Sequence, residues 1–169
     1  SSIDEFAEVT TQAVIDFCGE HDLPLPRLFV EPGRSLVANA GVTLYTVGIL
    51  KTLPNIRKYV AVDGGMSDNI RTALYHAEYE PTIANKAGQP RTEIVTLCGK
   101  HCESGDAVVV DMPLQHPDLG DIVCVFGTGA YCYTMASNYN GQPRPAIVFV
   151  KDGEARVTTR RETYADLYA

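Results

Sequence analysis

The sequence predicts a mainly β protein, in which a C-terminal antiparallel β-barrel or sandwich with short helices follows the last α/β step of a (β/α)8 barrel. Short β-rich runs separated by turns recur from residue 42 to residue 160, as in antiparallel barrels and sandwiches. Before them, residues 2–33 offer one helix and one strand, half of a repeating α/β unit. The 169 residues, 45% of them hydrophobic, suffice for one sizeable core or for one domain plus part of another.

The first helix is expected to run from residue 2 to about residue 18. Ser2 and Glu5 have the spacing of a capping box. Apolar residues recur near helical spacing at Ile3, Phe6, Ala13 and Phe17. Pro24 and Pro26 favour an extended linker after this helix.

Residues 28–33 (LFVEPG) predict a short apolar strand that ends in a turn. The motif EPGR at 31–34 would then lie at the carboxyl end of the last barrel strand, the face where barrel active sites gather. Because the sequence changes character after Arg34, we expect a barrel remnant at 1–38 and a β-domain at 39–169.

The β-domain is expected to contain strands at 42–52, 58–65, 93–99, 107–112, 121–126, 146–152 and 154–160. Asp152 and Gly153 lie at the centre of a predicted hairpin turn between the last two. Short helices are expected at 35–41, 69–76, 129–137 and 162–168.

The bulk properties exclude several classes of protein. A net charge of −7 argues against nucleic acid or an anionic membrane as a partner, because both favour clustered Lys and Arg. No apolar run is long enough to span a bilayer, and no secretory signal opens the chain. Five Cys without the spacing of a small disulfide scaffold indicate reduced thiols, so we expect a cytoplasmic protein.

The segment 99–106 (GKHCESGD) concentrates chemically useful groups immediately before the apolar run AVVVDM. Neighbouring carboxylates should disfavour the thiolate of Cys102, so a neutral thiol that can donate a proton is expected. Buried, inert thiols are expected at the other four cysteines, Cys18, Cys98, Cys124 and Cys132. Cys98, His101 and Cys102 also permit a metal-binding module as the weakest alternative; structural zinc normally needs four ligands, so we expect no metal.

Arg71 and Tyr75 are four residues apart, so they share a face of the predicted helix. A guanidinium and a phenol together suit a carboxylate, although a solvated surface Arg is the structural alternative. Asp68 and Asn69 are expected to cap this helix. In EPGR, Gly33 lets the backbone approach a ligand, whereas Glu31 and Arg34 could also form a surface ion pair.

Four stretches in this order, namely EPGR (31–34), DGGMSDNIRTALY (63–75), GKHCESGD (99–106) and GAYCYTMASNYN (129–140), resemble the C-terminal part of the diaminopimelate decarboxylase family. The resemblance covers roughly residues 1–168. It departs from the family's pattern at Thr72, where Pro is usual, and at Lys100-His101, where Pro usually follows the Gly.

The resemblance implies a pyridoxal 5′-phosphate (PLP) enzyme. It places Glu31 at the pyridine nitrogen, where it keeps the ring protonated. It places Gly33 and Arg34 near the cofactor phosphate and Tyr131 against the phosphate or ring. Arg34 and Tyr131 are also implied to contact the substrate.

For the substrate, the resemblance implies that Arg71 and Tyr75 bind the carboxylate that does not react and that Glu103 binds the distal ammonium. Cys102 is implied to be the catalytic proton donor. Both Cys102 and Glu103 are implied to reach across a homodimer interface into the partner's site.

The implied reaction is the decarboxylation of meso-2,6-diaminopimelate to L-lysine and CO2. The lysines Lys51, Lys58, Lys86, Lys100 and Lys151 stand in no family-like cofactor motif, so the Schiff-base lysine is missing. We therefore expect the C-terminal portion of a larger polypeptide, inactive alone. The alternatives are a sister decarboxylase acting on ornithine, arginine or carboxynorspermidine, and a non-catalytic regulatory homologue that kept the fold.

Overall fold

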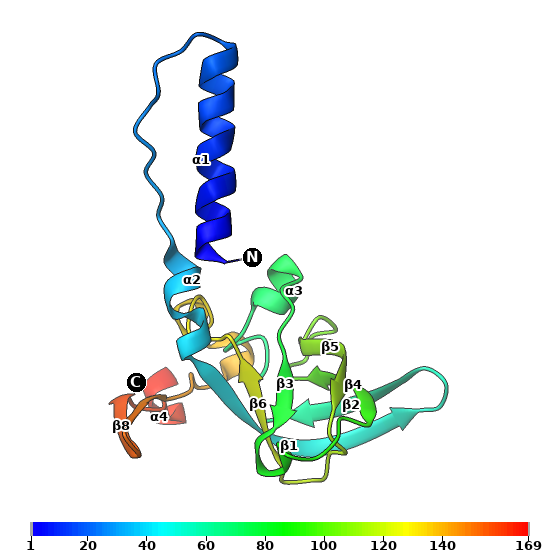
Figure 1. The fold of residues 1–169 in the computed structure, drawn as a ribbon. Coiled ribbons are helices and arrows are strands. Elements are labelled where there is room, and N and C mark those ends of the chain that lie inside the picture. The colour runs from blue at the N-terminus through cyan, green and yellow to red at the C-terminus, as the bar shows by residue number, and fades with distance from the viewer. Residues whose placement is uncertain (1, 169) are drawn as a thin grey trace. The chain divides into compact units, whose positions relative to one another are not determined.

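The computed structural model describes residues 2–168 and confirms the mainly β class (Figure 1). The chain divides into two compact units, Ser1–Pro32 and Gly33–Ala169. The predicted domains 1–38 and 39–169 stay a prediction. Within residues 2–168, no helix has the length and apolar character needed to cross a bilayer.

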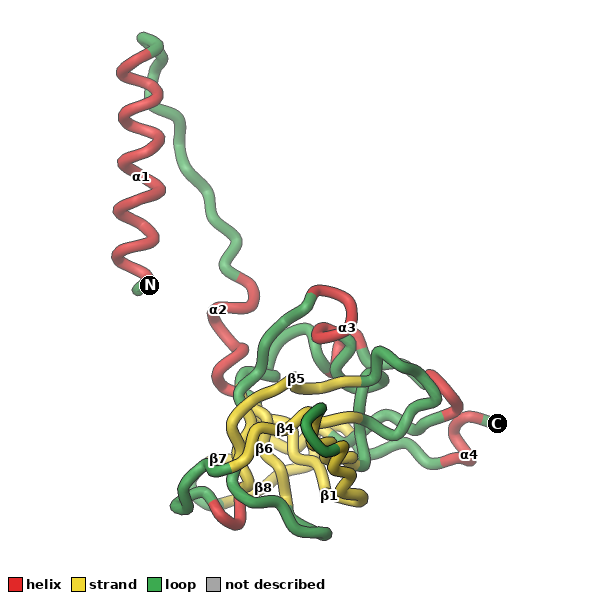
Figure 2. Tube along the Cα trace, turned by 90° about the vertical axis from the view of Figure 1, so that its right-hand side faces the viewer, coloured by secondary structure: helices red, strands yellow, loops and turns green. Residues whose placement is uncertain are grey.

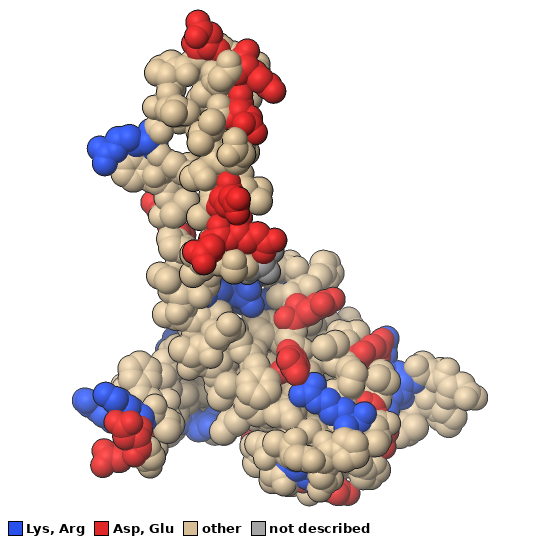
Figure 3. All heavy atoms as spheres, viewed as in Figure 1, with Lys and Arg blue, Asp and Glu red and all other residues tan. Residues whose placement is uncertain are grey.

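The first unit is built on helix α1 (Ile3–Glu20), which begins with the predicted capping box. Glu5 N–H donates to Ser2 Oγ at 3.1 Å, and Ser2 N–H donates to Glu5 Oε2 at 3.3 Å. Figure 3 shows acidic side chains along α1, whose sequence contains Asp4, Glu5, Glu8, Asp16 and Glu20.

The predicted strand at 28–33 is wrong, because residues 23–32 have no regular structure. A strand is held by hydrogen bonds to a neighbouring strand. None of the strands in residues 2–168 pairs with this segment.

The second unit contains one six-stranded sheet in the order β3-β6-β1-β2-β4-β5. Its edge strands, β3 and β5, contact each other, so the sheet is nearly closed (Figure 1). The strands are β1 (Val42–Leu53), β2 (Arg57–Val62), β3 (Pro81–Ile83), β4 (Glu93–Cys98), β5 (Ala107–Leu114) and β6 (Ile122–Phe126).

The sheet is mixed, because β2 and β4 are parallel whereas its other pairs are antiparallel. The connection between β2 and β4 contains α3 (Arg71–Tyr75), β3 and η2 (Ala84–Lys86), which is long enough to return the chain to its starting end. The sequence did not predict β3, which has three residues and begins with Pro81.

A separate hairpin joins β7 (Ile147–Lys151) and β8 (Glu154–Thr159). Asp152 (φ 52°) and Gly153 (φ 81°) form its turn in the left-handed region, as predicted. The predicted helix at 129–137 is reduced to the 3₁₀ turn η3 (Tyr133–Met135). The remaining helices, coloured red in Figure 2, are α2 (Gly33–Val37), η1 (Ala38–Ala40), η4 (Tyr139–Gly141) and α4 (Tyr164–Leu167).

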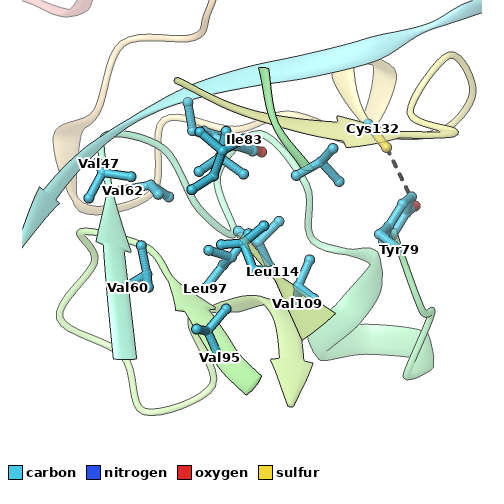
Figure 4. Packing of buried hydrophobic residues seen from close by; sticks show 14 residues of the cluster. Val47, Val60, Val62, Tyr79, Ile83, Val95, Leu97, Val109, Leu114 and Cys132 are labelled. Atoms are coloured by element: carbon cyan, nitrogen blue, oxygen red, sulfur yellow. Dashed lines mark hydrogen bonds between the residues drawn. The ribbon is translucent and has the colours of Figure 1, made fainter. Parts of the chain in front are cut away.

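The core fills the inside of the nearly closed sheet and gives its loops a rigid base. Val60, Val95, Leu97, Val108 and Val123 are completely buried there. Figure 4 shows Val60, Val95 and Leu97 converging from their strands with Ile83 and Leu114. Full burial of each Val or Leu contributes about 1.5–3 kcal/mol.

Candidate functional site

The segment 99–106, called the reactive loop from here on, joins β4 to β5 and is anchored at its base by Asp106. Asp106 is a buried residue. It accepts hydrogen bonds from Met66 N–H (2.7 Å), His101 N–H (2.8 Å) and His101 Nδ1 (2.8 Å). A buried carboxylate is stabilised when several hydrogen-bond donors surround it. Asp106 is therefore a structural anchor.

Two glycines make room for this anchor. A Cβ added at Gly99 would lie 2.2 Å from Asp106 Oδ2, and one added at Gly65 would lie 2.4 Å from Asp106 Oδ1. Gly65 also has a φ of 148°, which L residues rarely adopt. Gly65 and Gly99 therefore leave the space that the Asp106 carboxylate occupies, and a larger residue at either position would collide with it.

The tip of the reactive loop presents Cys102 and Glu103, which are both exposed. Cys102 N–H donates to Asn140 Oδ1 at 2.9 Å. Glu103 Oε2 accepts from Tyr139 Oη at 3.3 Å, and Glu103 Oε1 accepts from Gly105 N–H at 3.3 Å. The sequence analysis gave Tyr139 and Asn140 no role in the site and missed these contacts.

The other cysteines lie in different surroundings. All five cysteines are free; Cys18, Cys124 and Cys132 are buried as predicted, and Cys98 is half-buried. Burial raises the pKa of the Cys98, Cys124 and Cys132 thiols. Cys102 is the only exposed thiol among the five.

Arg71 lies between two tyrosine rings. Its Cζ is 5.2 Å from the centroid of Tyr75, on the same face of α3 as predicted, and 5.6 Å from the centroid of Tyr131. Arg71 Nε is buried and has no hydrogen-bond partner within residues 2–168. A buried donor of this kind calls for an acceptor such as a carboxylate.

The predicted capping of α3 is only partly right. Asn69 Oδ1 accepts the Arg71 N–H at 3.4 Å, but the N-cap position is Ile70, which has no side-chain cap. Asp68 is not a cap: it accepts from Tyr45 Oη at 2.6 Å and from Gly65 N–H at 2.7 Å. For Asn69 to be the N-cap, α3 would have to begin at Ile70, one residue before its actual start at Arg71.

Asn69 also connects α3 to the segment that carries Tyr131. The Cys132 thiol donates to Asn69 Oδ1 at 3.5 Å and lies 3.5 Å from Tyr79 Oη (Figure 4). Burial raises the pKa of Cys132, and the hydrogen bond to Tyr79 and the guanidinium groups of Arg71 and Arg34 partly oppose this. Both guanidinium groups therefore act on the electrostatic surroundings of Cys132.

Gly33 and Tyr131 are in close contact. A Cβ at Gly33 would lie 2.6 Å from Tyr131 Oη, so only glycine leaves the phenol where it is. Tyr131 itself has a φ of 60°, a conformation uncommon for a residue with a side chain. Glu31 belongs to the other compact unit, so its predicted place beside these residues stays a prediction.

The candidate residues thus form two groups within the second unit. One contains Gly33, Arg34, Arg71, Tyr75 and Tyr131, and the other contains Cys102 and Glu103. In the described part of the chain, no hydrogen bond, ion pair or cation–π contact joins Cys102 or Glu103 to Arg71, Tyr75 or Tyr131.

The residues of the metal-binding alternative do not form a site. Among residues 2–168, no three His, Cys, Asp or Glu side chains are grouped so as to hold a metal ion. His101 instead bonds to Asp106, and Cys102 lies in the exposed tip of the loop. Two of the five lysines are in ion pairs: Lys58 with Glu93, and Lys86 with Asp118 and Asp121.

Residues 11–129 match the family described as pyridoxal-dependent decarboxylase, C-terminal sheet domain. The chain is 51% identical over 163 residues to diaminopimelate decarboxylase of Bacillus subtilis, covering 96% of this chain and 37% of that protein. It is 51% identical over 166 residues to the Synechocystis enzyme of the same name, covering 98% of this chain and 35% of that protein.

Solved structures of proteins with the same name are similar in fold to this chain. Diaminopimelate decarboxylase from M. jannaschii in complex with L-lysine has a TM-score of 0.77 and 36% identity, covering 94% of this chain and 36% of that one. The Helicobacter pylori enzyme complexed with L-lysine has a TM-score of 0.73 and 34% identity, covering 82% and 33%. The chain therefore spans little more than a third of the length of these relatives.

Proposed function

Because this chain belongs to the pyridoxal-dependent decarboxylases, in which it matches the C-terminal sheet domain, we propose that it forms that part of an enzyme converting meso-2,6-diaminopimelate to L-lysine and CO2. The observation that carries this proposal is the position of Arg71 between Tyr75 and Tyr131, with a buried Nε that lacks an acceptor. Diaminopimelate has a second carboxylate that fits this need.

The surroundings of Tyr131 fit pyridoxal phosphate, the cofactor of this family. When bound, this cofactor draws electrons from the α-carbon of an amino acid and so favours the loss of CO2. Gly33 lets the Tyr131 hydroxyl approach the backbone closely, and Arg34 adds positive charge close by. Gly33, Arg34 and Tyr131 would hold the phosphate, and Glu31 would keep the pyridine nitrogen protonated.

Arg71 and Tyr75 would hold the carboxylate of the substrate that does not react. A guanidinium donates two parallel hydrogen bonds to a carboxylate, and a phenol adds a third. Glu103 would bind the distal ammonium, because its carboxylate is already oriented by Tyr139 and Gly105. Of these two contacts, the one to the carboxylate distinguishes diaminopimelate from ornithine, which has a distal ammonium but no second carboxylate.

Cys102 would return a proton to the carbon that has lost CO2. Its exposed position supports this role, because a proton donor must be able to reach the substrate carbon. The other thiols are buried or half-buried and are less accessible. The separation of Cys102 and Glu103 from the Arg71 group supports a homodimer in which each subunit lends these two residues to its partner's site. We place this biosynthetic enzyme in the cytoplasm.

The test measures decarboxylation by the complete enzyme on meso-diaminopimelate, L-ornithine and L-arginine. The Arg71→Ala variant is expected to lower kcat/KM for diaminopimelate about 100-fold or more. The matched control is Arg57→Ala, which removes an arginine that pairs with Asp111 on the surface, and it should leave kcat/KM unchanged.

Three results would contradict the proposal. If Arg71→Ala leaves diaminopimelate turnover unchanged, the chain belongs to a sister decarboxylase that yields a diamine. If ornithine or arginine is the preferred substrate of the unmodified enzyme, the same conclusion follows. If no amino acid is decarboxylated, the chain belongs to a non-catalytic homologue.

A further inference from the structure

Among the described residues, no hydrogen bond joins Cys102 or Glu103, at the tip of the reactive loop, to the strands that flank it. Asp106 anchors the base through Met66 and His101. Cys102 and Glu103 are exposed, and their contacts to other parts of the chain come from the segment 137–141. The position of both groups therefore depends on a segment more than thirty residues away.

Asn140 fixes the backbone of the tip. Its Oδ1 accepts the Cys102 N–H at 2.9 Å, which is shorter than the 3.3 Å hydrogen bond from Tyr139 to Glu103. Asn140 has a φ of 53°, in the left-handed region that asparagine tolerates better than most residues with a side chain. This conformation and the hydrogen bond together set where the Cys102 side chain begins.

Tyr139 fixes the side chain of Glu103. Its hydroxyl donates to Glu103 Oε2 at 3.3 Å, while Gly105 N–H and Ser104 Oγ share Glu103 Oε1. A carboxylate has about four lone-pair sites, so these three donors orient the anion and leave room for one more. Desolvation and the Glu103 charge raise the pKa of Tyr139, which keeps its hydroxyl a donor at neutral pH.

The segment 137–141 is itself held in place on two sides. Ser137 N–H donates to Ser67 O at 2.8 Å, and Asn138 Nδ2 donates to Glu162 Oε2 at 2.7 Å. The Tyr139 ring also lies 6.0 Å from the ring of His101, within the distance of an aromatic pair. This segment is thus a fixed support for the loop tip.

We propose that Tyr139 and Asn140 are positioning residues that hold Glu103 and Cys102 where the reaction needs them. This inference rests on the proposed function, in which Cys102 delivers a proton and Glu103 binds the distal ammonium. Misplacing a reacting group by about 1 Å costs on the order of 100-fold in rate, so a fixed tip has a direct catalytic value.

The first test needs only this chain and no activity. Hydrogen exchange of the Cys102 amide is compared among Asn140→Gly, Asn140→Asp and the unmodified protein. Glycine adopts the same backbone conformation but removes the acceptor, so Cys102 exchange is expected to rise about tenfold or more. Asp keeps an acceptor and should restore protection. Asn55→Gly is the matched control, because Asn55 has a φ of 59° in the β1–β2 turn.

The second test uses the complete enzyme. Asn140→Gly is expected to lower kcat about tenfold with little change in KM, because it affects the proton donor. Tyr139→Phe is expected to raise KM about tenfold, because it affects the group that binds the ammonium. The control Tyr164→Phe alters an exposed tyrosine of α4 and should change neither constant.

Equal Cys102 exchange in the unmodified protein and Asn140→Gly would overturn the inference. Unchanged kcat and KM in both Asn140→Gly and Tyr139→Phe would also overturn it. So would the same changes of kcat and KM in the two variants. Failure of the unmodified enzyme to decarboxylate diaminopimelate would instead reject the proposed function, while the exchange result on the chain would stand.

Discussion

The Asp106 carboxylate lies 2.8 Å from Nδ1 of His101, and their side chains are only 3% and 0% exposed. The same carboxylate also binds two backbone N–H groups, from Met66 and from His101 itself. An ionised acceptor surrounded by donors inside a protein is costly to disturb, because any donor left without a partner stays buried. The reactive loop therefore rests on one buried charge.

Replacing Asp106 with Asn is expected to lower the free energy of unfolding by about 3–5 kcal/mol, since it removes the charge and turns one acceptor atom into a donor. Urea denaturation of the chain, followed by far-ultraviolet circular dichroism, measures this change. The control Asp118→Asn removes a 67% exposed partner of Lys86 and should cost at most about 1 kcal/mol. Equal losses in the two variants would show that Asp106 is not the anchor.

Replacing Gly33 with Ala is expected to displace the Tyr131 hydroxyl, because the new Cβ would lie 2.6 Å from it. The phenol is the end of a side chain that can move, so the loss of stability should be under about 1 kcal/mol. The affinity of the complete enzyme for pyridoxal phosphate should fall about tenfold, as expected for one lost hydrogen bond to a charged group.

The control for this change is Gly88→Ala, whose added Cβ would meet no atom within 4 Å. Titration of each variant with the cofactor gives the two dissociation constants. An unchanged dissociation constant in Gly33→Ala would remove Gly33 and Tyr131 from the cofactor site.

The pKa of Glu162 is expected to be about 2, below its ordinary value of 4.5, because Arg144 holds the carboxylate. Arg144 Nε donates to Glu162 Oε1 at 2.7 Å, and Arg144 N–H donates to Glu162 Oε2 at 2.8 Å. A depressed folded-state pKa means that the ionised form is favoured by folding. Its stabilisation is complete above pH 4.5 and is lost as the pH falls through about 2.

Titration of the Glu162 side-chain carboxyl carbon by NMR measures this pKa. In Arg144→Ala the pKa should return toward 4.5, whereas the charge-matched control Lys151→Ala should leave it at about 2. A titration near 4.5 in the unmodified chain would contradict the ion pair.

The sequence predicted those elements whose pattern is local. The capping box of Ser2 and Glu5 and the Asp152-Gly153 turn depend only on residues close together in the chain. The longer strands were predicted because their apolar residues bury a common core. Arg71 and Tyr75 were paired correctly because helical spacing alone brings them to one face.

The features that were missed depend on contacts between distant segments. The parallel pairing of β2 with β4 follows from a long connection, and the three-residue strand β3 exists through its pairing with β6. Tyr139 and Asn140 support a loop more than thirty residues before them, which no local pattern records. The expected strand at 28–33 failed for the same reason, since a strand requires a partner.

The central claim is that the Arg71 group of one subunit works with Cys102 and Glu103 of its partner. Arg71→Ala and Cys102→Ala versions of the complete enzyme should each be nearly inactive. When their subunits are mixed and allowed to exchange, half of the dimers become hybrids with one intact site each.

The measurement is diaminopimelate decarboxylation by this mixture, compared with a control mixture of Arg71→Ala and Tyr75→Ala, which damage the same group. The two-fold arrangement predicts recovery of about a quarter of the unmodified activity in the first mixture and none in the control. No recovery in the first mixture, with subunit exchange verified, would contradict the shared site.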